Sequence, residues 1–89
     1  MDVGLGSIVF SKAGRDQGDY YVVVAVEGEY AYICDGKTRK SDKPKKKKFK
    51  HMAVTKTVSA LIKESLEETG KVTNAEIRRA ISDFREQEQ

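Results

Sequence analysis

This sequence is poor in the residues that build most catalytic and metal sites. Its 89 residues include a single cysteine, Cys34, and a single histidine, His51. One thiol cannot close a disulfide within the chain, and one thiol with one imidazole cannot supply the ligand set of a structural zinc site. A lone thiol within an apolar stretch is more often a small buried group than a nucleophile, which is the role we expect for Cys34.

The sequence also lacks tryptophan and long apolar runs. Its longest apolar stretch, residues 20–26, is far shorter than a transmembrane helix, and the first residues do not have the pattern of a secretory signal. We therefore expect a cytoplasmic protein with no membrane partner. Without tryptophan, an aromatic groove for proline-rich peptides lacks its usual ring. Recognition of such peptides is therefore the least favoured of the functions that we consider.

No arrangement of residues in the sequence is typical of an enzyme. A chain of this length is poorly suited to a deep catalytic cleft. The segment from Gly14 to Gly18 lacks the lysine and the serine or threonine of a phosphate-binding P-loop. We predict that the protein is not an enzyme and takes no cofactor, no metal and no small-molecule substrate.

Positive charge is concentrated in the first part of the chain. Residues 1–56 contain 12 Lys/Arg against 7 Asp/Glu, whereas residues 57–89 contain 5 against 7. Residues 37–50 alone contain nine basic side chains, opposed only by Asp42. Like charges at this density repel, so we expect this segment to be extended and mobile until an anionic partner neutralises it. The predicted anionic partner therefore binds the first half.

The same half is rich in residues that favour β-strands. Strands are predicted at residues 7–11, 20–26 and 30–34, and a further strand at about 49–54. The second of these is apolar on both faces, which indicates a strand covered on both sides. Short strands joined by tight turns indicate a small curled sheet or barrel, and this pattern fits an SH3-like barrel, an OB-fold or a small sandwich.

The last third of the chain predicts two short amphipathic helices. Apolar residues recur at helical spacing from Val58 to Leu66, and Gly70 is a natural stop. A capping box at residues 73–76 opens a second apolar stripe, from Ile77 to Phe84. Neither helix would be stable alone in water, so they pack on each other, on the sheet or on a partner. We divide the chain into residues 1–56 and a helical extension, residues 57–89.

Residues 6–26, with Gly14 and Gly18 inside them, resemble the KOW motif of ribosomal proteins and transcription elongation factors. Many KOW sequences have a third glycine where this chain has Tyr21. The resemblance continues through Asp35-Gly36 and the lysine run to about residue 55. Over that length the chain is most similar to the L-fourteen-e type of large-subunit ribosomal protein of archaea and eukaryotes. This resemblance implies an SH3-like barrel and a loop that touches ribosomal RNA.

The predicted RNA-binding site combines this loop with the lysine-rich segment. Glycines allow the backbone to approach RNA, and the planar guanidinium of Arg15 suits a phosphate or an unpaired base. Lysines neutralise phosphates and release condensed counterions. The predicted RNA-binding residues are Lys12, Gly14, Arg15, Gln17, Gly18, Lys37, Arg39, Lys40, Lys43, Lys45, Lys46, Lys47, Lys48 and Lys50.

The sequence contains four tyrosines, at positions 20, 21, 30 and 32. Strand alternation places Tyr30, Tyr32 and Cys34 on one face. An outward tyrosine could stack on a base, but rings that cover the ends of the barrel are the favoured interpretation.

We predict a mainly β protein with an α extension, namely a small SH3-like KOW barrel followed by two short C-terminal helices. Its predicted function is RNA binding, as a ribosomal or ribosome-associated component of translation. Ribosomal RNA is the expected partner, ribosomal proteins are further partners, and the free chain is a monomer. The alternative is a KOW-type protein-interaction module of a transcription or translation factor, which binds a protein partner through its helices.

Overall fold

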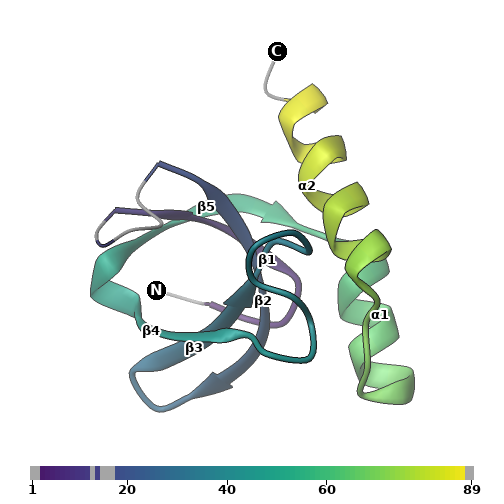
Figure 1. Ribbon diagram of the computed structural model, residues 1–89, viewed down its shortest axis with the longest axis horizontal. Helices are drawn as coiled ribbons and strands as arrows, with labels where there is room; N and C mark the ends of the chain where they lie inside the picture. The colour runs from purple at the N-terminus through teal and green to yellow at the C-terminus, as the bar shows by residue number, and fades with distance from the viewer. Residues whose placement is uncertain (1–2, 13, 15–17, 88–89) are drawn as a thin grey trace.

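The computed structural model describes residues 3–12, 14 and 18–87. Within these residues, one five-stranded antiparallel sheet is followed by two helices (Figure 1). The elements are β1 (Ser7–Ser11), β2 (Tyr20–Glu27), β3 (Tyr30–Cys34), β4 (Lys45–Lys48), the 3-10 helix η1 (Phe49–His51), β5 (Met52–Val58), α1 (Ala60–Thr69) and α2 (Asn74–Gln87). The predicted β-rich first part with a helical extension is confirmed.

The sheet order is β4-β3-β2-β1-β5, so the two edge strands, β4 and β5, are consecutive in the chain. A single turn of 3-10 helix, η1, joins them, and a link this short requires the sheet to curl (Figure 1). The Phe49 N–H donates to the Glu29 carbonyl at 3.0 Å, and the Lys12 N–H donates to the His51 carbonyl at 2.9 Å. The turn is therefore hydrogen-bonded both to the β2–β3 hairpin and to the end of β1.

Each face of the sheet has its own apolar cluster, because successive side chains on a strand point to opposite faces. One cluster is formed by side chains of the strands alone: Val9, Tyr21, Val23, Ala31, Ile33 and Met52. The other combines the strand residues Ile8, Val22 and Cys34 with Ile62, Ile77, Ala80, Ile81 and Phe84 of the helices. Val22 and Val23 of β2 are thus buried on opposite sides, and the predicted strand covered on both faces is confirmed.

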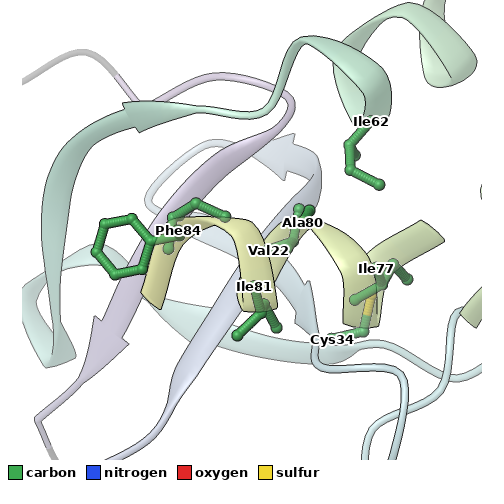
Figure 2. Close-up of a cluster of buried hydrophobic side chains, with 8 residues drawn as sticks. Val22, Cys34, Ile62, Ile77, Ala80, Ile81 and Phe84 are labelled. Carbon is green, nitrogen blue, oxygen red and sulfur yellow. The ribbon is translucent and has the colours of Figure 1, made fainter. Parts of the chain in front are cut away.

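The helices cover the second cluster (Figure 2). The apolar residues of α2 lie along one side of that helix, facing Val22 and Cys34, and Ile62 of α1 lies beside them. Of the three positions that the sequence allowed for the helices, the structure shows two: they pack on the sheet and on each other. No helix in the described part of the chain is both long and apolar enough to cross a membrane.

The two ends of α1 are determined by residues at the ends themselves, Ser59 and Gly70. The Ser59 hydroxyl accepts a hydrogen bond from the Ile62 N–H at 3.3 Å, which caps the first turn. Gly70 ends the helix in the left-handed conformation, with a φ of 73°, as predicted. Val58, which we placed in the apolar stripe of this helix, instead ends β5 and is 51% exposed. The Ser59 cap starts the helix after that residue, so the stripe begins one turn later.

The predicted capping box of α2 is also confirmed. The Glu76 N–H donates to the Thr73 hydroxyl at 3.1 Å, and the Thr73 N–H donates to the Glu76 carboxylate at 2.9 Å. The Ser65 hydroxyl of α1 donates to the same carboxylate at 3.0 Å. Hydrogen bonds from the Thr73 backbone, the Ser65 hydroxyl and the Thr73 hydroxyl lower the pKa of Glu76. This carboxylate therefore joins the two helices.

Candidate nucleic-acid interface

The lysine run, Lys45–Lys48, forms β4, an edge strand of the sheet. Its residues pair with β3, Lys47 opposite Ala31 and Lys46 opposite Tyr32. The expected extended conformation is confirmed for these residues. They are paired with β3 rather than free, and backbone hydrogen bonds to β3 offset the repulsion between their charges. Lysine is common on edge strands, where charge discourages pairing with a further strand. The predicted strand at residues 49–54 begins later, at Met52, because residues 49–51 form η1.

Strand alternation divides the four lysines between the two faces of the sheet. Lys46 and Lys48 lie opposite Tyr32 and Tyr30, whereas Lys45 and Lys47 lie opposite Ile33 and Ala31. Lys47 is only 7% exposed, on the face where Ala31 and Ile33 join the strand cluster. A lysine stem can lie along apolar surface in this way. Lys47 is thus the predicted RNA-binding lysine that is buried in the folded protein.

Two of the tyrosines meet the lysines of β4. The Lys46 Nζ lies 4.6 Å from the centre of the Tyr30 ring and 5.9 Å from that of Tyr32, and the Lys48 Nζ lies 5.8 Å from Tyr30. Such cation–π contacts are worth ~0.5–1 kcal/mol at exposed sites. We call these four residues, Tyr30, Tyr32, Lys46 and Lys48, the aromatic–lysine surface.

One carboxylate lies beside the aromatic–lysine surface. The Tyr32 hydroxyl donates to the Glu27 carboxylate at 3.1 Å. The other oxygen of Glu27 lies 3.7 Å from the Lys46 Nζ. Glu27 therefore orients both the ring and the ammonium group.

The other two tyrosines are structural. Tyr21 is 2% exposed within the strand cluster. Tyr20 lies between two aromatic rings, 5.1 Å from the ring centre of Phe10 and 4.9 Å from that of Phe84. The favoured interpretation, that the rings cover the ends of a barrel, stays a prediction. Tyr20 and Tyr21 pack with the apolar clusters, whereas Tyr30 and Tyr32 belong to neither.

The turn between β3 and β4 carries further basic residues and is organised by Asp35. Its carboxylate accepts from the Arg39 N–H at 2.8 Å, the Lys37 N–H at 2.9 Å and the Thr38 hydroxyl at 2.9 Å. Partial burial alone would raise the pKa of Asp35, but the hydrogen bonds from Arg39, Lys37 and Thr38 outweigh it and lower the pKa. The turn leaves four basic side chains exposed: Lys37, Arg39, Lys40 and Lys43.

Asp35 is expected to make part of the stability dependent on pH. Because its folded pKa lies below the ordinary value of 3.8, its contribution is complete above that value and is lost as the pH falls through the folded pKa. Asp35→Asn should lower the free energy of unfolding by about 1–2 kcal/mol near neutral pH, and by less in acid. Urea unfolding across a pH series measures this difference. Asp42→Asn, the same change on an exposed side chain of the turn, is the control; an equal loss there would contradict the prediction.

The basic turn also contacts the first residues of α2. The Arg78 side chain donates to the Gly36 carbonyl at 2.7 Å, and the Asn74 side chain accepts from the Ser41 N–H at 2.7 Å. Gly36 has a φ of 78°, and a Cβ there would lie 2.6 Å from the Asn74 carbonyl oxygen. Only glycine fits this close approach, so α2 positions the turn that carries the cations.

Two arginines that we did not predict extend the basic region. Arg78 and Arg85 lie seven residues apart on α2 and line a hollow of about 400 Å³ together with Lys37 of the turn; Asp19 and Asp35 also line it. We did not predict these arginines because residues 57–89 carry a net negative charge, which directed attention to the first half of the chain. Their spacing, which puts both on one side of a helix, is the signal that could have identified them.

The loop between β1 and β2 is described in part. Gly14 and Gly18 have φ values of 84° and 93°, a left-handed conformation that glycine adopts at little cost. Lys12 is exposed, and its N–H donates to the His51 carbonyl, adjacent to Lys50. The start of the loop and the end of the lysine-rich segment are thus brought together. Arg15 and Gln17, two further predicted RNA-binding residues, lie outside the described residues.

Cys34 is buried against the helices, as expected for a small apolar group. Burial, and secondarily the neighbouring Asp35 carboxylate, raises the pKa of Cys34 to about 12. Its thiol is therefore protonated at neutral pH. Within the described ranges, no three His, Cys, Asp or Glu side chains gather in a way that could bind a metal ion.

A comparison with protein-family models and a comparison with curated proteins each found no match to this chain. A functional proposal therefore has to rest on the residues and the geometry of this chain.

Proposed function

We propose that this protein binds structured RNA through the basic edge formed by β4, the turn before it and the β1–β2 loop. The observation that carries the proposal is the fixed presentation of cations along one edge. Lys37, Arg39, Lys40, Lys43, Lys46 and Lys50 are all exposed on a segment that hydrogen bonds to β3 and to α2 hold in position. A cationic edge held in place matches a phosphate backbone without first having to become ordered.

We further propose that the sheet is an SH3-like barrel of the KOW type. The order β4-β3-β2-β1-β5 and the 3-10 turn between the two edge strands support this fold. The glycine-containing loop after β1, which lies within the segment that resembles the KOW motif, supports the type. By that resemblance, ribosomal RNA is the proposed target and the protein is a ribosomal or ribosome-associated component.

The arrangement of the helices favours RNA over a protein partner. An interaction module would need an apolar helical surface to offer, but Ile62, Ile77, Ile81 and Phe84 are already buried against the sheet. Among the described residues of α1 and α2, Leu61 is the large apolar side chain that remains well exposed, at 44%, and Val58, 51% exposed, lies just before them at the end of β5. A single exposed leucine is ordinary for a protein surface.

Binding of the purified protein to a structured RNA is expected to weaken steeply with salt. If about five cations neutralise phosphates, the slope of log K against log salt should be roughly −3.5 to −4.5. Fluorescence anisotropy with a fragment of ribosomal RNA over a series of salt concentrations measures this slope. A slope near zero, or no binding at low salt, would overturn the proposal.

Sedimentation from a cell lysate tests the ribosomal assignment separately. A tagged protein that travels with the large ribosomal subunit at high salt would support an integral site. Its release into fractions of free RNA would keep the RNA-binding proposal and remove the ribosomal one.

A further inference from the structure

The aromatic–lysine surface has a composition that neutralisation of phosphates alone does not require. The pairing of β3 with β4 places Tyr30 opposite Lys48 and Tyr32 opposite Lys46, so all four side chains share one face. Both rings are half-buried, and neither joins an apolar cluster. The surface lies on the same face as Cys34, but outside the cluster that the helices cover.

Aromatic rings with adjacent ammonium groups suit one kind of ligand in particular. Single-stranded nucleic acid offers the flat face of a base to a ring and its phosphates to nearby cations. A continuous RNA duplex offers phosphates, but its bases are stacked on one another and cannot lie on a side chain. The described contacts therefore favour unpaired nucleotides.

We propose that the aromatic–lysine surface binds unpaired nucleotides of RNA, with bases stacked on Tyr30 and Tyr32 and phosphates on Lys46 and Lys48. This inference rests on the proposed function and specifies the part of the RNA that is bound: a loop, a bulge or an end. The aromatic–lysine surface would thus differ in its ligand from the exposed cations of the preceding turn. Those cations would contact phosphates whether or not the bases are paired.

The present contacts of Lys46 are compatible with such a ligand. Its side chain is 45% exposed, so the ammonium group can leave the Tyr30 ring for a phosphate oxygen. That move replaces a weak cation–π contact with a charge-assisted hydrogen bond and frees the face of the ring.

The carboxylates nearby define the side from which a phosphate chain approaches. Glu27 contacts Lys46 and Tyr32, and it repels phosphates from that end of the surface. Beside Lys48 is a hollow of about 380 Å³, lined by Phe49 and Lys50 with Glu29. Two ammonium groups against one carboxylate make this hollow the more favourable path.

Replacement of both rings is expected to weaken binding of unpaired RNA selectively. The probes are a labelled oligouridylate of about ten nucleotides and a fully paired RNA duplex of equal length. The double variant Tyr30→Leu, Tyr32→Leu should bind the oligouridylate more weakly, by roughly 5- to 150-fold for each stacked base that is lost, and bind the duplex like the wild type. The control Tyr30→Phe, Tyr32→Phe keeps both rings and loses only the hydroxyls, so it should retain most of the affinity for the oligouridylate that the leucine variant loses.

An unchanged affinity of the leucine variant for the oligouridylate, or an equal loss on the duplex, would overturn the inference alone. Failure of the wild type to bind either RNA would overturn the proposed function and the inference with it. Nuclear magnetic resonance of the wild type is independent of any effect of the variants on folding. The ring protons of Tyr30 and Tyr32 should shift when the oligouridylate is added, and those of the buried Tyr21 should not; unmoved Tyr30 and Tyr32 signals would overturn the inference.

Discussion

Neutralising Lys37, Lys40 and Lys43 together by Lys→Gln substitutions is expected to weaken RNA binding ~100- to 500-fold at about 0.1 M salt. These side chains are exposed on the turn that Asp35 and α2 hold in one conformation. Each lost phosphate contact flattens the slope of log K against log salt by about 0.7–0.9. The loss of three contacts therefore makes the slope less negative by about two to three. The loss of affinity is largest at low salt. Anisotropy titrations at several salt concentrations report both quantities.

The matched control neutralises three lysines outside the basic segment. Lys56, Lys63 and Lys71 are also exposed, and their replacement with glutamine changes the net charge of the protein by the same amount. This second variant should retain most of its affinity, because its lost charges lie on β5, α1 and the link between the helices. Equal losses in the two variants would mean that net charge, rather than the position of the turn, governs binding.

The substitution Gly36→Ala is expected to lower the free energy of unfolding by about 2–5 kcal/mol. The left-handed conformation of Gly36 costs about 1–2 kcal/mol for a residue with a Cβ. The added carbon would also lie 2.6 Å from the Asn74 carbonyl oxygen and 2.9 Å from the Arg78 Cγ, and such crowding typically costs about 1–3 kcal/mol more. Because small domains are stable by only about 5–15 kcal/mol, chemical unfolding should resolve this loss readily.

Gly28→Ala is the control for the backbone conformation alone. Gly28 also has a positive φ, 58°, but an added Cβ would meet no atom within 4 Å. Its cost should therefore be limited to about 1–2 kcal/mol. Similar losses for the two variants would contradict the conclusion that the basic turn is closely packed on α2.

Local signals account for the elements that the sequence predicted well. β-branched and aromatic residues, alternating between two apolar faces, were sufficient for β1, β2 and β3. Gly70 and the Thr73–Glu76 box determine the end of α1 and the start of α2 through hydrogen bonds to their own neighbours in the chain. Ser59 caps the start of α1 in the same way, although we had placed Val58 in that helix. These interactions span few residues, so they can be read without knowledge of the fold.

The strand β4 could not be predicted in the same way. Four consecutive lysines have little preference for a strand and repel one another. They form one because β3 offers its free edge, with Tyr30 opposite Lys48 and Ile33 opposite Lys45. That pairing, rather than anything local, buries Lys47 and gathers Lys46 and Lys48 beside the tyrosines.

The sequence by itself thus determined where charge is concentrated, where most strands and helices begin and end, and which residues of a strand share a face. Only the tertiary structure decided which cations are exposed, which tyrosines stay outside the apolar clusters and that α2 supports the basic turn. The physical reason is distance along the chain. The Arg78–Gly36 and Asn74–Ser41 hydrogen bonds join residues 42 and 33 positions apart, and such contacts exist only once the helices have buried their apolar side chains against the sheet.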